Sequence, residues 1–333
     1  MGVCVYSFGR RRPKSAYEFL EYCHGLGAGG VQTELDSLET EYAQRLRRRA
    51  EQLGMYLEVI TGLPREDSDA FERTVRAAKE AGAVCLRSAC LDGRRYERFA
   101  TLDDWKRFVA ESNNRIARSL PILEKHGMLL GLENHKDWTA EELAALLKGY
   151  SSEYLGACID TGNNLALLDE PMDLVERLAP YAVTTHFKDM AVEEYAEGFL
   201  LAEVPLGQGM LDLKRLVGTI ARARPRAKFT LEMITRNPLQ IPCLSERYWA
   251  TLPDRSGECL ARTLSLVRAR KLERPLPRPD ALDPAVRLRL EEDNVRQCLA
   301  YAREQLGFQP SAISSQPSAN IEARADFSLR AEG

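Results

Sequence analysis

The sequence predicts an α/β fold of the (β/α)8, or TIM-barrel, type with a C-terminal helical extension. Short β-rich runs alternate regularly with longer amphipathic stretches, and several of these runs have one apolar and one polar face. These alternating strand and helix segments span roughly residues 1–270, close to the ~250 residues typical of such a barrel. A chain of 333 residues, 44% hydrophobic and 29% charged, has room for one large barrel or two smaller domains.

Eight runs rich in apolar and β-branched residues are predicted to form the barrel strands. They are residues 2–8, 29–35, 55–61, 83–89, 128–134, 154–160, 182–188 and 228–234. Amphipathic stretches between them, such as "TEYAQRLRRRAEQLG", end in glycine, as many helices do. The rival fold, a doubly wound open sheet, usually has a glycine-rich turn after its first strand. The segment "SFGRRRPKS" has no such pattern, which favours the barrel.

Residues 271–333 differ in character from the predicted barrel of residues 1–270. The segment "KLERPLPRPDALDP" is a proline-rich linker, and residues 284–307 are predicted to form an extra helix. The polar tail, residues 310–333, is expected to be mobile or to reach a neighbouring subunit. Residues 193–209 carry too little helical signal and are predicted to form a hairpin over the strand ends.

Charge and cysteine content limit the class of partner and the compartment. A net charge of -3 gives no reason to expect nucleic acid or a membrane surface as a partner. The eight cysteines form no C-x-x-C pair and several lie in apolar runs, which indicates buried free thiols in a reducing compartment. With no signal-peptide pattern and no apolar run near the ~20 residues of a membrane helix, a cytoplasmic location is expected.

Four consecutive predicted strands each end in an ionisable group on their polar face. In the run 154–160, Leu155 and Ile159 share one face and Asp160 lies on the other, because side chains alternate along a strand. The C-terminal strand ends of such a barrel hold the active site. The four groups on that rim are Glu133, Asp160, His186 and Glu232.

A divalent cation would explain why three carboxylates and an imidazole converge. Carboxylates forced together repel one another, and a cation removes that repulsion. Taken singly, an aspartate before "TGN" is usually a turn former and a strand histidine is often a core residue, but the shared position and parity favour a metal site. Mostly oxygen ligands suit one Mn²⁺, Mg²⁺ or Co²⁺ ion better than a thiolate-type zinc site, although Zn²⁺ is possible.

The remaining histidines separate into structural and functional candidates. His24 and His126 precede glycines at predicted helix ends, where an imidazole suits the negative end of the helix dipole. His135 shares the lumen face with Glu133 and is expected to face substrate. Asn134, on the opposite face, is expected to brace the loop.

With these residues in place, the chain resembles the xylose-isomerase-like superfamily of sugar phosphate isomerases and epimerases. The matching stretches are "GLENH", "CIDTGN", "THFKDM", "PLGQGMLDL" and "TLEMI", in that order, within residues 1–270. The resemblance implies that the matching Glu133, Asp160, His186 and Glu232 bind the metal.

The resemblance also implies proton transfer next to a carbonyl. The metal would chelate a carbonyl oxygen and the neighbouring hydroxyl of a keto sugar and stabilise an enediolate. Glu133 and Glu232 would act as the catalytic acid and base on opposite sides of that plane. Return of the proton to the opposite face gives epimerisation, and return to the neighbouring carbon gives isomerisation.

Further residues are candidates for binding substrate. Lys188 and His135 are expected to stabilise oxyanions, and Arg87 and Lys136 to bind sugar hydroxyls or an acid group. Ketohexose 3-epimerases of this family carry a substrate-binding histidine where this chain has Asn163, which argues against that activity. The pattern of His186, Lys188 and Asp189 looks more like the inositol-ketone dehydratase and uncharacterised isomerase branches.

The expected protein is a manganese- or related metal-dependent isomerase or epimerase of carbohydrate metabolism, forming a homo-oligomer and acting on a small sugar or polyol. The main alternative is a metal-dependent lyase or dehydratase acting on a keto sugar, a keto-inositol or a 3-keto-glycoside. An endonuclease of the endonuclease IV type would resemble enzymes with a histidine-rich trinuclear zinc site. Two of the four histidines are assigned to helix ends, so too few remain for such a site. A non-catalytic sugar sensor is the last alternative.

Overall fold

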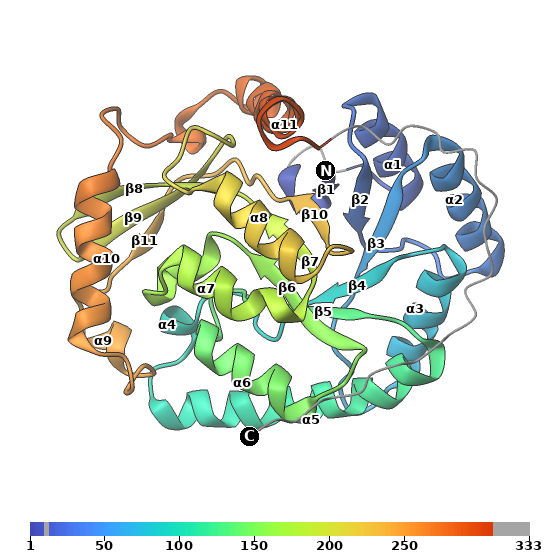
Figure 1. Ribbon diagram of the computed structural model, residues 1–333, viewed down its shortest axis with the longest axis horizontal. Coiled ribbons are helices and arrows are strands. Elements are labelled where there is room, and N and C mark those ends of the chain that lie inside the picture. The colour runs from blue at the N-terminus through green and yellow to red at the C-terminus, as the bar shows by residue number, and fades with distance from the viewer. Residues whose placement is uncertain (10–12, 309–333) are drawn as a thin grey trace.

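The computed structural model describes residues 1–9 and 13–308 and contains a closed barrel of parallel strands (Figure 1). Each predicted strand run contains one observed strand, so the predicted (β/α)8 fold is confirmed. The first run stops early, because a 3-10 helix over Val5–Ser7 replaces its second half. The barrel strands are β1 (Gly2–Cys4), β2 (Gly30–Thr33), β3 (Tyr56–Ile60), β4 (Cys85–Ser88), β5 (Leu130–Glu133), β6 (Leu155–Asp160), β7 (Ala182–Phe187) and β10 (Lys228–Leu231).

Helices surround the barrel, and their ends follow from local sequence. Thr139 and Glu142 form a capping box at the start of α6, and Gly54 and Gly127 end α2 and α5 in the left-handed conformation that glycine adopts freely. The surrounding helices are α1 (Ala16–Gly25), α2 (Thr40–Leu53), α3 (Asp69–Glu80), α5 (Leu102–His126), α6 (Ala140–Tyr150), α7 (Pro171–Leu178), α8 (Leu213–Ala223) and α11 (Pro284–Leu306).

Helix α11 is the extra helix predicted after the proline-rich linker, and it packs between α8 and α1 (Figure 1). Its Val295, Cys298 and Leu299 are buried in the same core as the barrel strands. We therefore propose that the barrel domain extends through α11, beyond the boundary at residue 270 that the sequence suggested. The tail expected to be mobile, from residue 310, lies outside the described residues.

A second sheet lies beside the barrel, at the left of Figure 1. It has the order β11-β9-β8 and consists of β8 (Asp189–Tyr195), β9 (Gly198–Val204) and β11 (Leu239–Ile241). The predicted hairpin is confirmed as β8 and β9, which pair antiparallel. Three further helices, α4 (Arg95–Arg98), α9 (Glu246–Trp249) and α10 (Gly257–Arg270), lie on this side, and α10 contacts both hairpin strands.

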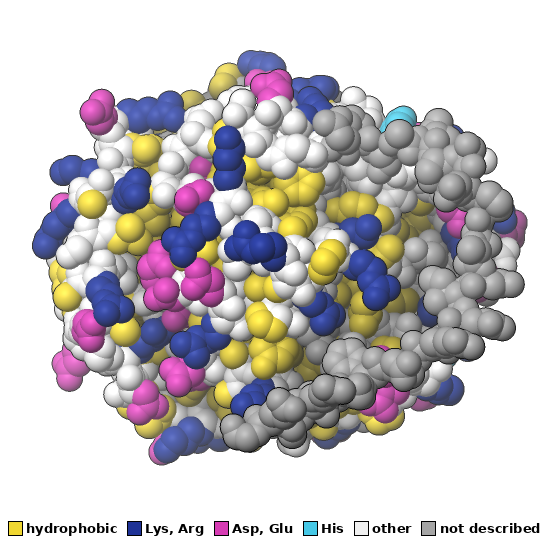
Figure 2. Space-filling model, in the orientation of Figure 1, with side chains coloured by type: hydrophobic (Ala, Val, Ile, Leu, Met, Phe, Trp, Pro, Cys, Tyr) yellow, Lys and Arg dark blue, Asp and Glu magenta, His cyan; other side chains and the backbone are white. Residues whose placement is uncertain are grey.

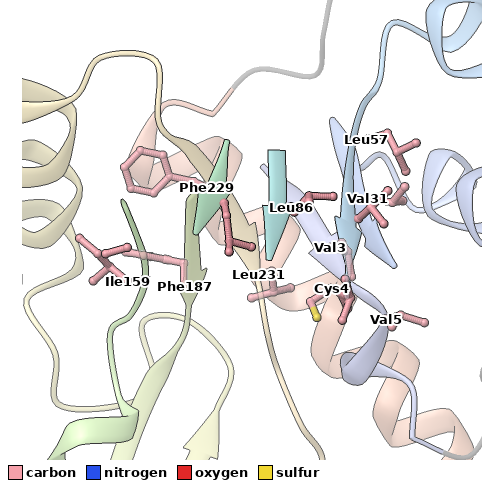
Figure 3. Packing of buried hydrophobic residues seen from close by; sticks show 14 of the residues in the cluster. Val3, Cys4, Val5, Val31, Leu57, Leu86, Ile159, Phe187, Phe229 and Leu231 are labelled. Atoms are coloured by element: carbon pink, nitrogen blue, oxygen red, sulfur yellow. The ribbon is translucent and has the colours of Figure 1, made fainter. Parts of the chain in front are cut away.

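The main core fills the space between strands and helices. Figure 3 shows Val3, Val31 and Leu57 grouped on adjoining strands, with Phe187 and Phe229 on the other side of the view. The two phenylalanine rings meet edge to face at 5.8 Å. Full burial of each such side chain contributes about 1.5–3 kcal/mol, so the apolar face of each strand holds the barrel rigid beneath its polar rim.

The molecular surface is mixed in charge. Figure 2 shows basic and acidic side chains interspersed on the face it presents. None of the helices within residues 1–9 and 13–308 combines the length and apolarity needed to cross a membrane.

Candidate metal centre and active site

The four ionisable side chains predicted at the rim meet at the C-terminal ends of β5, β6, β7 and β10. Strand register produces this meeting, since Asp160 pairs with His186, and His186 with Thr230 two residues before Glu232. One ligand atom from each of Glu133, Asp160, His186 and Glu232 lies within 4.8 Å of the others. All four residues are buried.

Two of the atoms that face the centre of this cluster lack a hydrogen-bond partner. His186 Nδ1 lies 3.1 Å from Glu133 Oε2, 3.1 Å from Glu232 Oε1 and 4.0 Å from Asp160 Oδ2. Within the described part of the chain, neither His186 Nδ1 nor Asp160 Oδ2 forms a hydrogen bond of good geometry, although Lys188 Nζ is 2.8 Å from the latter oxygen. Buried polar atoms are rarely left this way, and a shared cation would satisfy them all.

A neighbouring amide fixes the orientation of the His186 ring. Gln32 Nε2 donates to Glu58 Oε2 at 2.9 Å, which leaves Gln32 Oε1 to accept from His186 Nε2 at 2.6 Å. Once a cation is bound, a neutral imidazole with its proton on Nε2 would present the lone pair of Nδ1 to that cation. Burial lowers the pKa of His186, but the anions around it, including Glu133 and Glu232, raise that pKa well above its usual value.

Cations keep two of the carboxylates ionised. Burial raises the pKa of Glu133, but Arg87, whose Nε lies 2.6 Å from Glu133 Oε2, and His186 bring it well below its usual value. The pKa of Glu232 is also held low, against burial, by His186 and Lys188. Two ionised glutamates can act as proton acceptors.

Asp160 differs from the two glutamates, because burial raises its pKa despite the opposing charge of Lys188. Its Oδ1 accepts from the backbone N–H groups of Gly162 at 2.9 Å and Asn163 at 2.7 Å. These bonds leave Oδ2 facing Lys188 Nζ at 2.8 Å and His186 Nδ1 at 4.0 Å.

The predicted substrate-binding residues lie around this cluster. Asn163 Nδ2 donates to Glu133 Oε1 at 3.0 Å, and Asn163 Oδ1 accepts from Lys136 Nζ. His135 Nδ1 lies 3.0 Å from Leu91 O, and burial lowers the pKa of His135 to about 3, so its imidazole is neutral.

The loop after β5 is held by two residues. Asn134 bridges β5 and β6, since its side chain donates to Asp160 O at 2.9 Å and accepts from Asp160 N at 2.8 Å. Arg95, which is 1% exposed, donates from its backbone N to Lys136 O at 3.0 Å and from Nη1 to Asp137 O at 3.1 Å. Arg95 also stacks 3.6 Å from the Trp105 ring centroid. The loop is therefore preorganised.

Asp189 of the "HFKD" pattern supports a turn instead of contacting the cluster ligands. Its carboxylate accepts from the N–H groups of Gly207, Gly209 and Leu211 at 3.0, 2.9 and 3.1 Å. This ties the end of the hairpin to the rim.

Four residues of the site were not predicted from the sequence. Gln32 and Glu58 lie below the cluster, while Glu203 and Arg236 lie beside it. Gln32 and Glu58 share the lumen-facing parity of their strands, so the parity argument used for the later strands identifies both when extended to β2 and β3. Glu203 comes from the hairpin and has no such signal.

A cavity of about 450 Å³ opens beside the rim. Its wall includes Glu203, Met233 and Arg236, and the proline-rich linker with part of α11 covers the other side. Glu203 pairs with Arg236 at 2.8 Å and lies 3.5 Å from Lys188 Nζ. This chain of charges connects the cavity to the cluster.

Comparison with known proteins agrees with this architecture. The family model described as the xylose isomerase-like TIM barrel matches residues 20–255. The chain belongs to the xylose isomerase-like TIM barrel family. The sequence-based resemblance is thereby confirmed.

Individual relatives are more distant. The 3-oxo-isoapionate decarboxylase of Pectobacterium atrosepticum is 28% identical over 233 residues, covering 66% of this chain and 80% of the relative. The crystal structure of D-psicose 3-epimerase in the presence of D-fructose has a TM-score of 0.59 at 15% identity, covering 92% of this chain and 99% of that one.

A xylose isomerase-like TIM barrel protein from Mycobacterium smegmatis, solved in complex with magnesium, has a TM-score of 0.55 at 16% identity, covering 80% of this chain and 97% of that one. At such identities these structural likenesses establish the fold. Membership of the family indicates an enzyme acting on a small sugar-like molecule.

Proposed function

We propose that this protein is a divalent-metal-dependent isomerase or epimerase of keto sugars. The observation that carries the proposal is the buried cluster of three carboxylates and one imidazole, in which unpartnered atoms face a common centre. A cation held by Glu133, Asp160, His186 and Glu232 would supply Lewis acidity to a carbonyl and its neighbouring hydroxyl.

The donor set favours an oxygen-preferring ion. Cys4 and Cys158 also lie close enough to His186 to form alternative three-residue sets. Burial raises the pKa of the Cys158 thiol well above its usual value, so this thiol competes poorly as a thiolate. Mn²⁺, Mg²⁺ and Co²⁺ suit the carboxylate set, and manganese remains the ion predicted from the sequence.

The protein side chains would carry out the proton transfer. One of the two ionised glutamates, Glu133 or Glu232, removes the proton from the carbon next to the carbonyl, and an enediolate results. In epimerisation the other glutamate first takes up a proton from solvent and delivers it to the opposite face, and the first glutamate afterwards gives its proton back to solvent. In isomerisation the first glutamate returns its own proton to the neighbouring carbon. Lys188, in contact with Glu232, is placed to donate a hydrogen bond to the developing oxyanion.

Hydrogen exchange tests this proposal directly. Metal-loaded protein incubated in D₂O with a panel of keto sugars is expected to incorporate deuterium at carbon, detected by NMR. Glu232→Gln should abolish incorporation, whereas Glu72→Gln, a matched change on the outer helical layer, should not. Absence of exchange across the panel in metal-loaded protein would contradict the proposal.

A lyase is the second candidate, and the 3-oxo-isoapionate decarboxylase relative favours it. In a decarboxylation the electron pair of the bond to the carboxylate moves toward the ketone, carbon dioxide leaves, and a protein acid protonates the resulting carbanion. Product mass separates the candidates, since decarboxylation or dehydration lowers the mass and isomerisation does not. The cytoplasmic location and the homo-oligomeric state remain predictions from sequence.

A further inference from the structure

Lys136 is a buried cation without an anionic partner. The residue is 4% exposed, and its Nζ contacts the neutral Asn163 Oδ1. Among the described residues, no carboxylate oxygen lies within 4.0 Å of this nitrogen. The other three cations at the rim each contact a carboxylate, in the pairs Arg87–Glu133, Lys188–Asp160 and Arg236–Glu203.

Two features of Lys136 are energetically unfavourable. An unpaired buried ammonium is unfavourable, and burial accordingly lowers the pKa of Lys136 to about 8. The backbone of Lys136 also has φ of 62°, a left-handed conformation that a lysine rarely adopts. Arg95 and the carboxylate of Asp137, which accepts from His135 N and Trp138 N, hold the loop in this shape. Such strain is typical of functional positions.

Asn163 places the ammonium beside the metal cluster. The same amide that contacts Lys136 donates to Glu133 Oε1 at 3.0 Å, so Lys136 is separated from the ligand set by one side chain. Asp137, the nearest acid in sequence, uses its Oδ1 for the two backbone N–H groups of its own loop. The positive charge is therefore available to a molecule bound at the cluster.

We propose that Lys136 binds a carboxylate of the substrate, which makes the substrate class keto-sugar acids rather than neutral sugars. The inference rests on the proposed function of the same site. A hydroxyl would leave the buried charge uncompensated, whereas a carboxylate supplies one negative charge for one ammonium. A phosphate dianion would need a second unpaired cation, and Arg87, Lys188 and Arg236 already pair with carboxylates.

The test compares binding of D-gluconate and D-glucitol, which have six carbons each and differ by the carboxylate. Dissociation constants are measured by NMR titration on full-length protein, after chelator treatment and dialysis, and again with Mg²⁺. Wild-type protein is expected to bind D-gluconate at least ~10-fold more tightly than D-glucitol. Lys136→Met should remove this preference, and Lys148→Met, the same change on the exposed surface of α6, should keep it.

Each other outcome overturns the proposal. Wild-type protein without a preference, or a preference that survives in Lys136→Met, means that the carboxylate binds elsewhere, for instance on the ion. Tighter binding of D-glucitol 6-phosphate than of D-gluconate means a phosphate site. Lys136→Gln serves as a second variant if Lys136→Met does not fold. This experiment measures binding and not turnover. A negative result would therefore not contradict the proton-transfer proposal, which the hydrogen-exchange experiment tests separately.

Discussion

Two layers of the same barrel lumen bury carboxylates in opposite ways. In the lower layer, Glu58 receives hydrogen bonds from three neutral donors, Thr184 Oγ1 at 2.7 Å, Gln32 Nε2 at 2.9 Å and Thr230 Oγ1 at 2.9 Å. In the upper layer, Glu133 and Glu232 contact cations and His186.

The pKa values differ in consequence. Burial raises the pKa of Glu58, and its neutral donors only partly offset that effect. At Glu133 and Glu232 the neighbouring cations outweigh burial and lower the pKa. Hydrogen bonds alone therefore make a carboxylate part of the scaffold, whereas charge keeps it ionised and ready to bind a cation or accept a proton.

The largest effect is expected in the upper layer. Glu232→Gln removes a base and one ligand, so the rate of carbon-bound hydrogen exchange should fall by about 10³-fold or more. The unfolding free energy of the metal-free protein should fall, because the buried cations Lys188 and His186 lose one of their anionic partners. If the exchange rate of Glu232→Gln stays within tenfold of wild type, Glu232 is not a catalytic base.

In the lower layer, a substitution should reduce stability and metal affinity but leave the exchange rate near wild type once metal is saturating. Glu58→Gln places an amide N–H₂ among donors, so the unfolding free energy should fall by about 1–3 kcal/mol, measured by denaturant titration. Because Glu58 orients Gln32 and through it His186, metal affinity should weaken by roughly 10–100-fold. With saturating metal, exchange should recover to near the wild-type rate. Loss of exchange that metal cannot restore would mean that Glu58 itself takes part in the chemistry.

Metal removal should lower the stability of the wild-type protein through the upper layer. Chelator treatment should lower the melting temperature, and Mn²⁺ at about 100 times its dissociation constant should restore about 2.7 kcal/mol of stability. Asp160→Asn should abolish the response, since its Oδ2 then carries no charge. An equal response in Asp160→Asn and wild-type protein would place the ion elsewhere.

The smallest effect concerns a carboxylate outside the lumen. Hydrogen bonds from Lys125 and His126 lower the pKa of Glu72 to about 2, against a usual value of 4.5. The stabilisation from a lowered carboxyl pKa is complete above the unfolded value and is lost as the pH falls toward 2. Glu72→Gln should therefore be slightly less stable than wild type at pH 7 and equal to it near pH 2, in thermal melts at both values. A difference that persists at pH 2 would contradict this assignment.

Much of this organisation could be predicted from the sequence. Side chains alternate along a strand, which determines which of them face the lumen. Asp160 and His186 were predicted on the lumen face in this way, and they lie opposite each other in the register of β6 and β7. The helix-end position of His126 was also predictable, since His126 is the last residue of α5. There its Nε2 lies 2.9 Å from Glu72 Oε1.

Other features depend on contacts that sequence does not encode locally. Glu203 reaches Lys188 only because the hairpin folds back, and α11 joins the barrel core from behind a linker. Arg95 appears in the sequence as one more basic residue on a short helix, yet its 1% exposure and its bonds to Lys136 and Asp137 follow from three-dimensional packing.

Anomalous diffraction from crystals grown with Mn²⁺ would locate the ion itself. We expect one strong peak per chain, in direct contact with carboxylate oxygens of Glu133, Asp160 and Glu232 and with His186 Nδ1. A peak bound by other residues, or no peak in crystals soaked at millimolar Mn²⁺, would contradict it.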